Sequence, residues 1–222
     1  MSSYYLPSCA FSRTFPEESR HIQAYASSHL SLELLGCCEG VCRDPDFLQP
    51  GDTVVYICHN CEAIVKESHP EVNLVSIWEL IDQDPEFVFP DYRGKEVLLQ
   101  DCWRTNDCPG EQAAVRSLMG KAHLSVRELP RHGAEADFCG ASLYRPTSPK
   151  NIDLAPHRFT VLGAGLFTPH SEEEQRRLMR DYCKAHISLP VVAYCKHCVE
   201  GLTWGGADCR HLGSLLFTPS PW

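Results

Sequence analysis

Short apolar runs rich in β-branched and aromatic residues alternate with amphipathic segments along this chain of 222 residues. The apolar runs have the length and composition of buried strands. They cover residues 3–7, 53–57, 96–100, 123–129 and 190–194. The amphipathic segments predict helices over 16–29, 61–69, 110–120 and 171–186, and residues 72–81 begin as a strand and end as a helix. Alternating strands and helices predict an α/β fold with short parallel sheets.

The pattern repeats within the chain. Residues 53–61 and 190–198 both consist of an apolar strand that runs directly into a Cys-x-x-Cys motif, and the order of predicted elements starts again at Lys95. Such repetition indicates an internal duplication. We therefore expect two tandem related α/β units, residues 1–94 and 95–222, with each motif at the carboxyl end of a parallel strand. Residues 142–167 contain prolines and glycines that break this pattern, and they are predicted to form a loop.

Charge and hydropathy exclude several classes of partner. The formal net charge is −9, and the lysines and arginines form no long block, which argues against nucleic acid. No apolar stretch is long enough to cross a bilayer, so membrane insertion is not expected. The first fifteen residues lack a basic region followed by an apolar run, so they do not resemble a signal peptide. These features predict a cytoplasmic protein.

Thirteen cysteines are the strongest chemical signal in the sequence. A chain of this length buries a hydrophobic core without disulfides, and several cysteines form close pairs, which points to metal ligands. Thiols at the start of a helix ionise more readily, as metal binding requires. The first half contributes five candidates, Cys9, Cys37, Cys38, Cys58 and Cys61. The second half contributes Cys102, Cys139, Cys195 and Cys198. A structural zinc takes four ligands, so the fifth thiol of the first half favours a multi-iron cluster, with zinc as the alternative.

The order of these cysteines resembles the CCG-domain family, also called the cysteine-rich domain family, which is best known from heterodisulfide reductase. A single cysteine, a Cys-Cys pair and a Cys-x-x-Cys motif recur there in two tandem copies. The five cysteines of the first half match one copy, and Cys102, Phe138-Cys139-Gly140 and Cys195/Cys198 match the second. The resemblance implies CCG-type units at 1–94 and 95–222, with a noncubane 4Fe-4S cluster bound by the five cysteines of the first.

Three departures from the family pattern make the two sites unequal. Phe138 replaces the first cysteine of the second pair, which leaves four matched thiols, enough for a cubane 4Fe-4S cluster or for zinc. Glu39 stands between the first pair and Gly40. Only nineteen residues separate Cys38 from Cys58, which is short for the family and predicts the loss of a crossover helix.

Other residues near the motifs are secondary candidates. Cys108 is a candidate fifth ligand in the second half, and the roles of Cys42, Cys183 and Cys209 are open, with packing expected for Cys183. His59 and His197, inside the two Cys-x-x-Cys loops, could donate to a cluster sulfur but are expected to be exposed. Arg13 and Arg104 could stabilise an anionic substrate or the charge of a cluster, but ordinary surface positions are expected for both.

The resemblance implies oxidoreductase chemistry on sulfur groups, namely cleavage or formation of a disulfide at an iron–sulfur cluster. A small thiol or disulfide would be the substrate. Because the sequence has neither a ferredoxin cysteine run nor a dinucleotide fingerprint, a redox partner protein would have to supply the electrons. Two alternatives stay open at this point. One is a non-catalytic electron-transfer or assembly subunit, and the other is a zinc-stabilised binding module.

Overall fold

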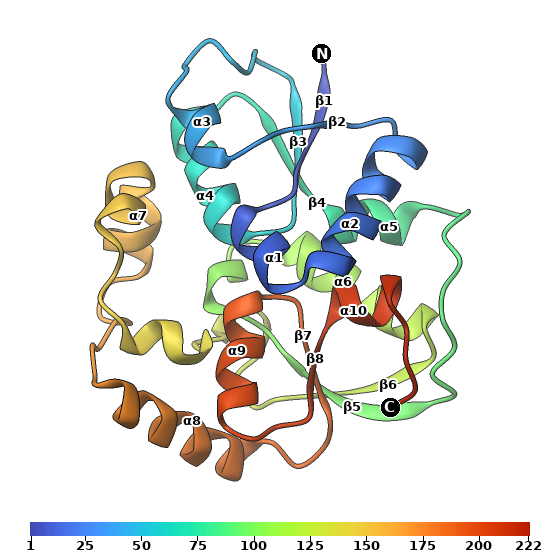
Figure 1. Ribbon diagram of the computed structural model, residues 1–222, viewed down its shortest axis with the longest axis vertical. Helices are drawn as coiled ribbons and strands as arrows, with labels where there is room; N and C mark the ends of the chain where they lie inside the picture. The colour runs from blue at the N-terminus through green and yellow to red at the C-terminus, as the bar shows by residue number, and fades with distance from the viewer. The chain divides into compact units, whose positions relative to one another are not determined.

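Four short parallel strands form the sheet of the first unit, in the order β2-β1-β3-β4 (Figure 1). In this computed structural model, which describes residues 1–222, the strands are β1 (Ser3–Leu6), β2 (Glu33–Leu34), β3 (Thr53–Tyr56) and β4 (Asn73–Ser76). β3 pairs with β1 on one side and β4 on the other. Its apolar residues are buried, as expected for a central strand of a parallel sheet.

The helices of the first unit follow the strands closely. They are α1 (Cys9–Thr14), α2 (Pro16–Ala24), α3 (Cys38–Cys42) and α4 (His59–Ser68), and α5 (Ile77–Gln83) begins in this unit and ends in the second. Pro16 lies in the first turn of α2 with two glutamates after it, a favourable start because proline lacks an amide donor and carboxylates suit the helix dipole. The predicted helix over 16–29 is confirmed, and its last five residues form a π-helical turn, η1 (Tyr25–His29).

The sheet of the second unit repeats the first, in the order β6-β5-β7-β8. Its strands are β5 (Lys95–Gln100), β6 (Leu124–Glu128), β7 (Val191–Ala193) and β8 (Cys209–His211), all parallel. Each strand therefore has a counterpart of the same rank in the first sheet. The predicted α/β fold in two related units is confirmed.

The second unit has longer helices than the first. Its helical segments are η2 (Trp103–Thr105), α6 (Pro109–Lys121), η3 (Gly133–Glu135), η4 (Gly140–Tyr144), α8 (Glu172–His186), α9 (Lys196–Trp204) and α10 (Leu212–Phe217). Ser171 caps α8 by accepting a hydrogen bond from the Glu174 amide. Residues of α8 at intervals of four, Gln175, Met179 and Cys183, are buried. No helix in the chain combines the length and the apolar character needed to span a bilayer.

The boundary between the units differs from the one predicted at residue 94. The first unit comprises Met1–Leu80 with Thr147–Ala164, and the second comprises Ile81–Pro146 with Gly165–Trp222. Residues 81–94 pack in the second unit because their aromatic side chains find partners there. The Phe87 ring lies 5.5 Å from the Phe217 ring, and the Tyr92 hydroxyl donates to the Leu215 carbonyl at 2.9 Å.

The prediction of a loop over 142–167 is wrong. This segment contains the end of η4, the helix α7 (Pro149–Leu154) and the π-helical η5 (His157–Leu162). Pro149 starts α7 instead of breaking regular structure, because proline is tolerated in the first turn of a helix. The part from Thr147 to Ala164 belongs to the first unit, where α7 packs beside α4 (Figure 1).

The short spacing between Cys38 and Cys58 explains this placement of α7. The crossover from β2 to β3 contains only the five-residue α3, whereas the crossover from β6 to β7 contains the fifteen-residue α8. α8 packs against α9, the helix that follows the second Cys-x-x-Cys motif. α7 occupies the corresponding position beside α4, the helix that follows the first motif. The inserted segment, residues 147–164, thus packs a helix against α4, which the short crossover between β2 and β3 does not provide.

Charged contacts attach this segment to the first unit. The Arg158 guanidinium lies 3.0 Å from a Glu62 carboxylate oxygen, and both side chains are only 3% exposed. The backbone amides of His157 and Arg158 donate to the Glu67 carboxylate at 2.8 and 2.9 Å. Lys150 also pairs with Glu39. Because Glu62 follows Cys61 directly, the segment is anchored beside the first Cys-x-x-Cys motif.

We expect the substitution Arg158→Ala to lower the free energy of unfolding by about 3 kcal/mol, because it leaves the buried Glu62 carboxylate with only the half-exposed Lys66, 3.5 Å away, as a cationic partner. Chemical denaturation followed by circular dichroism would measure the loss. The matched control is Arg43→Ala, which removes an exposed pair with Glu39 whose Arg43 side chain is 72% exposed. That change should cost less than about 1 kcal/mol. Equal losses for the two variants would contradict this account of the segment.

Candidate metal centre

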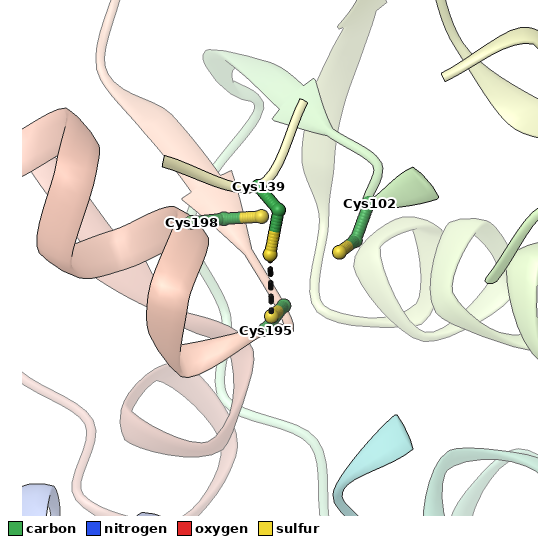
Figure 2. A group of neighbouring side chains, drawn as sticks. All are labelled: Cys102, Cys139, Cys195 and Cys198. Atoms are coloured by element: carbon green, nitrogen blue, oxygen red, sulfur yellow. Dashed lines mark hydrogen bonds between the residues drawn. The ribbon is translucent and has the colours of Figure 1, made fainter. Parts of the chain in front are cut away.

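Four thiols of the second unit converge on one point (Figure 2). They belong to Cys102, Cys139, Cys195 and Cys198, and their sulfur atoms all lie within 4.8 Å of one another. The Sγ atoms of Cys139 and Cys195 are 3.9 Å apart. All four side chains are buried, with Cys195 the most exposed at 8%.

Strand order explains why residues far apart in sequence meet here. β6, β5 and β7 are neighbours in the sheet and run in the same direction, so their carboxyl ends share one edge. Cys102 lies two residues after the end of β5 and caps η2, and Cys195 lies two residues after the end of β7 and caps α9. Cys198 lies in the first turn of α9, and Cys139 reaches the edge through the loop after β6. The predicted placement of both Cys-x-x-Cys motifs at strand ends is confirmed, since Cys58 likewise caps α4 after β3.

Gly140 allows the Cys139 loop to approach α9. Its φ of +59° favours glycine, and a Cβ atom there would overlap the carbonyl oxygen of His197 and the backbone of Gly201. Only a residue without a side chain lets the two backbones lie this close, which places Cys139 next to Cys195. In the first unit Glu39 follows Cys38, and Gly40, one residue further on, has no atom within 4 Å of where its Cβ would be. The first unit lacks this close approach.

A buried carboxylate holds the three thiol-bearing segments together. Asp101, directly before Cys102, is 0% exposed. One of its oxygens accepts from the Tyr194 hydroxyl at 2.6 Å, and the other accepts from the Gly133 amide at 2.7 Å. Tyr194 directly precedes Cys195, and Gly133 lies in the loop that leads to Cys139. Arg116 pairs with the same carboxylate at 2.6 Å, so its charge is balanced.

Arg104 is not the surface cation that was expected. It is 4% exposed, and its guanidinium donates to the Cys139 sulfur. Burial acts to raise the pKa of Cys139, but hydrogen bonding with Cys102 and the charge of Arg104 lower it to about 7. Burial raises the pKa of Cys102 and Cys198. Burial therefore favours the thiol form of Cys102 and Cys198, whereas the Arg104 cation favours the thiolate form of Cys139.

The donor set fits a metal ion or an iron–sulfur cluster. Four thiolates form a complete ligand set for either, and both require anionic sulfur. A tetrahedral ion with bonds of about 2.3 Å would hold its sulfurs about 3.8 Å apart, close to the observed separation of Cys139 and Cys195. A four-iron cluster binds each thiolate through a different iron atom, so its four cysteine sulfurs must lie farther apart than those around a single ion. Arg104 would offset part of the negative charge of either occupant.

The five thiols of the first unit lie in related positions but are more open. Cys9 begins α1 after β1, and Cys37 caps α3 after β2. Cys61 forms hydrogen bonds with the thiols of Cys38 and Cys58, which raise the pKa of Cys61 and lower the pKa of its two partners. Cys38 and Cys61 are buried, Cys58 is half-buried, and Cys9 and Cys37 are exposed. The residues predicted here lie together at one sheet edge, although the compact four-thiol group forms in the second unit.

The other candidates near the second group take separate roles. Phe138 packs its ring on Tyr182 of α8, with the ring centres 4.3 Å apart, so this position serves the core. Cys108 caps α6 and is not a member of the four-thiol group. Cys183 packs as predicted, with its thiol 3.6 Å from the Leu202 carbonyl oxygen. His197 is partly exposed and lies 3.6 Å from Glu200.

The four remaining candidate residues have mixed outcomes. His59 is buried at 2% exposure beside the Tyr56 ring, so its expected exposed position is wrong. Arg13 is exposed, as expected. The Cys42 thiol donates to the Glu39 carbonyl within α3. Cys209, whose role the sequence leaves open, lies on β8, and burial raises its pKa.

Sequence reasoning missed Asp101 and Tyr194 entirely. The only available signal was position, because each precedes a predicted ligand at the end of an apolar strand. A charged residue directly after a buried strand needs a partner, and that requirement could have flagged Asp101. No family model, curated protein or solved structure matches the chain.

Proposed function

We propose that this protein is an iron–sulfur redox protein in which Cys102, Cys139, Cys195 and Cys198 hold a 4Fe-4S cluster. The observation that carries the proposal is the buried group of four cysteine sulfurs at one edge of a parallel sheet, a complete set of thiolate ligands that would move apart to bind such a cluster. Such a cluster would supply one-electron transfer. The chain's own contribution is to exclude water, fix the thiols through Asp101 and offset negative charge through Arg104.

The hydrophobic cores argue that the centre serves more than folding. Each unit already has a four-stranded sheet with buried apolar residues on β3 or β7. Small domains that depend on a structural zinc lack such a core and unfold without the metal. In addition, the thiols lie at the carboxyl edge of the sheet, where α/β proteins bind their ligands. A functional centre is the better explanation.

The first unit would bind the substrate in this proposal. Its five thiols match the CCG-domain pattern, and they would hold a noncubane 4Fe-4S cluster. The exposure of Cys9 and Cys37 supports access for a small thiol or disulfide, whereas the buried second centre suits electron relay. Electrons would come from a redox partner protein. Disulfide reductase activity similar to that of heterodisulfide reductase is the chemistry that the resemblance favours.

Metal and sulfide analysis of protein purified without oxygen tests the proposal. We expect a brown protein with about four iron and four sulfide ions for each occupied site. Reduction by dithionite should bleach the visible absorption. Turnover of a disulfide by the reduced protein would then separate a reductase from a relay or assembly subunit. Zinc without iron in freshly isolated protein would refute the iron–sulfur assignment.

A zinc-stabilised module is the second candidate, and one observation favours it. All four sulfurs lie within 4.8 Å, a spacing that suits a single tetrahedral ion without any movement of the thiols. A zinc protein would be colourless and inert towards dithionite. The same metal analysis therefore decides between the two candidates.

A further inference from the structure

A pocket of about 460 Å³ lies in the second unit, away from the thiols. Its walls come from the turn before β5 and from the end of the chain, and they include Pro90, Asp91, Tyr92, Arg93, Lys95, Pro219 and Trp222. Figure 1 shows the C-terminal residues beside the start of β5. β5 has six residues, so the pocket and Cys102 are separated by about 20 Å along the strand. The pocket is therefore distinct from the candidate metal centre.

The aromatic walls of the pocket are held in place. The Trp222 indole donates to Asp208 at 2.9 Å, and the Arg210 guanidinium stacks 4.6 Å from the Trp222 ring centre. Arg210 also donates to the carbonyl oxygens of Ser220 and Pro221. The Tyr92 ring meets Trp222 edge-on at 6.3 Å. Two fixed rings and several prolines form a largely rigid apolar surface, as small-molecule pockets commonly have.

The turn before β5 adopts a conformation that ordinary side chains disfavour. Arg93 has a φ of +54°, followed by Gly94 at +76°. The Arg93 amide donates to the Asp91 carboxylate at 2.8 Å, and the Gly94 amide donates to the His123 carbonyl at 2.7 Å. These contacts hold an arginine where glycine would be easier to accommodate. Arg93 is one of the residues that line the pocket.

Two cations that line the pocket, Arg93 and Lys95, form no ion pair, although Asp91 lines the same pocket. Most other arginines of the second unit do form ion pairs. The Asp91 carboxylate is engaged with the His123 ring at 2.9 Å and with the Arg93 amide at 2.8 Å. Unpaired cations stand out in a chain whose formal net charge is −9. They are available to bind an anion.

We propose that this pocket binds a small planar aromatic anion. The ring of the ligand would lie against Tyr92, Trp222 and the prolines, because aromatic surfaces pack well on one another. Its carboxylate or phosphate group would pair with Arg93, whose planar fork matches such anions, and with Lys95. This inference is independent of the proposed redox function.

Calorimetric titration of the intact protein with naphthalene carboxylate tests the inference. We expect saturable binding, weakened about tenfold or more when naphthalene carboxamide, of the same shape but without charge, replaces the acid. The double variant Arg93→Gly, Lys95→Gln should lose a similar factor. Glycine suits the left-handed backbone at residue 93, so misfolding would not explain the loss.

Arg127→Ala is the matched control. It removes an exposed cation of β6 that pairs with Glu96 and lies outside the pocket, so binding should stay within about twofold of the wild-type value. Three outcomes would overturn the inference. They are no saturable binding to the wild-type protein, equal binding of acid and amide, and equal binding by the wild-type protein and the double variant.

Discussion

Replacing Cys198 with serine is expected to abolish tight metal binding in the second unit. The Cys198 sulfur is one of four that lie within 4.8 Å of one another, and its side chain is 0% exposed. Loss of one thiolate leaves three ligands and a buried hydroxyl that binds soft metals poorly. Because loss of an outer partner already costs about 10- to 100-fold in affinity, loss of a ligand should cost more than about 100-fold.

Competition with a chromophoric chelator measures the affinity, and Cys183→Ser provides the matched control. Cys183 is also buried in the second unit, but its thiol faces the Leu202 carbonyl and not the other sulfurs. That variant should keep its metal. Cys38→Ser should likewise leave the second site loaded while it alters the spectrum of the first. A Cys198→Ser protein that retains metal as tightly as the Cys183→Ser protein would rule out the four-thiol centre.

The substitution Asp101→Asn should weaken the same centre without touching a ligand. Asp101 accepts hydrogen bonds from Tyr194 and Gly133 and pairs with Arg116, so it joins the segments that deliver three of the four thiols. Asparagine removes the charge that Arg116 balances and turns one acceptor into a donor. We expect a loss of about 3 kcal/mol in the free energy of unfolding and of about 10- to 100-fold in metal affinity.

Glu128→Gln separates this effect from simple loss of a salt bridge. Glu128 is the other carboxylate partner of Arg116, at 2.7 Å, but it is 33% exposed and touches no thiol-bearing segment among its hydrogen bonds. Its removal should cost about 1 kcal/mol or less and leave metal affinity unchanged. Thermal unfolding of the metal-free proteins and chelator competition give the two readouts. If the two variants lost metal affinity equally, Asp101 would have no special role in the centre.

Local signals were enough to predict much of the fold. The β-branched run before Cys58 and the capped, glutamate-rich start of α8 depend on neighbouring residues, so the chain displays them directly. Recurrence of the strand and Cys-x-x-Cys pattern at 190–198 also revealed the duplication. The predicted loop failed for a related reason. Pro149 marks a helix start as readily as a break, and only the packing of α7 on α4 distinguishes the two.

Which thiols converge was decided by the tertiary structure. Cysteine count favoured the first unit, because five thiols exceed the four of the second. The close approach of Gly140 to Gly201 instead draws Cys139 onto α9 in the second unit, and Gly40 makes no such approach. Such a contact joins residues that are distant in sequence, so no local pattern contains it.

The sequence by itself therefore determined the α/β class, the duplication and the edge of each sheet at which the thiols lie, because periodicity and strand ends are local properties. The tertiary structure alone decided the burial of Arg104 beside Cys139, the role of Asp101 and the transfer of Thr147–Ala164 to the first unit. Each of these depends on which distant groups satisfy a buried charge or cover an exposed helix. Burial of a charge costs free energy unless a partner is present, and only the folded chain supplies that partner.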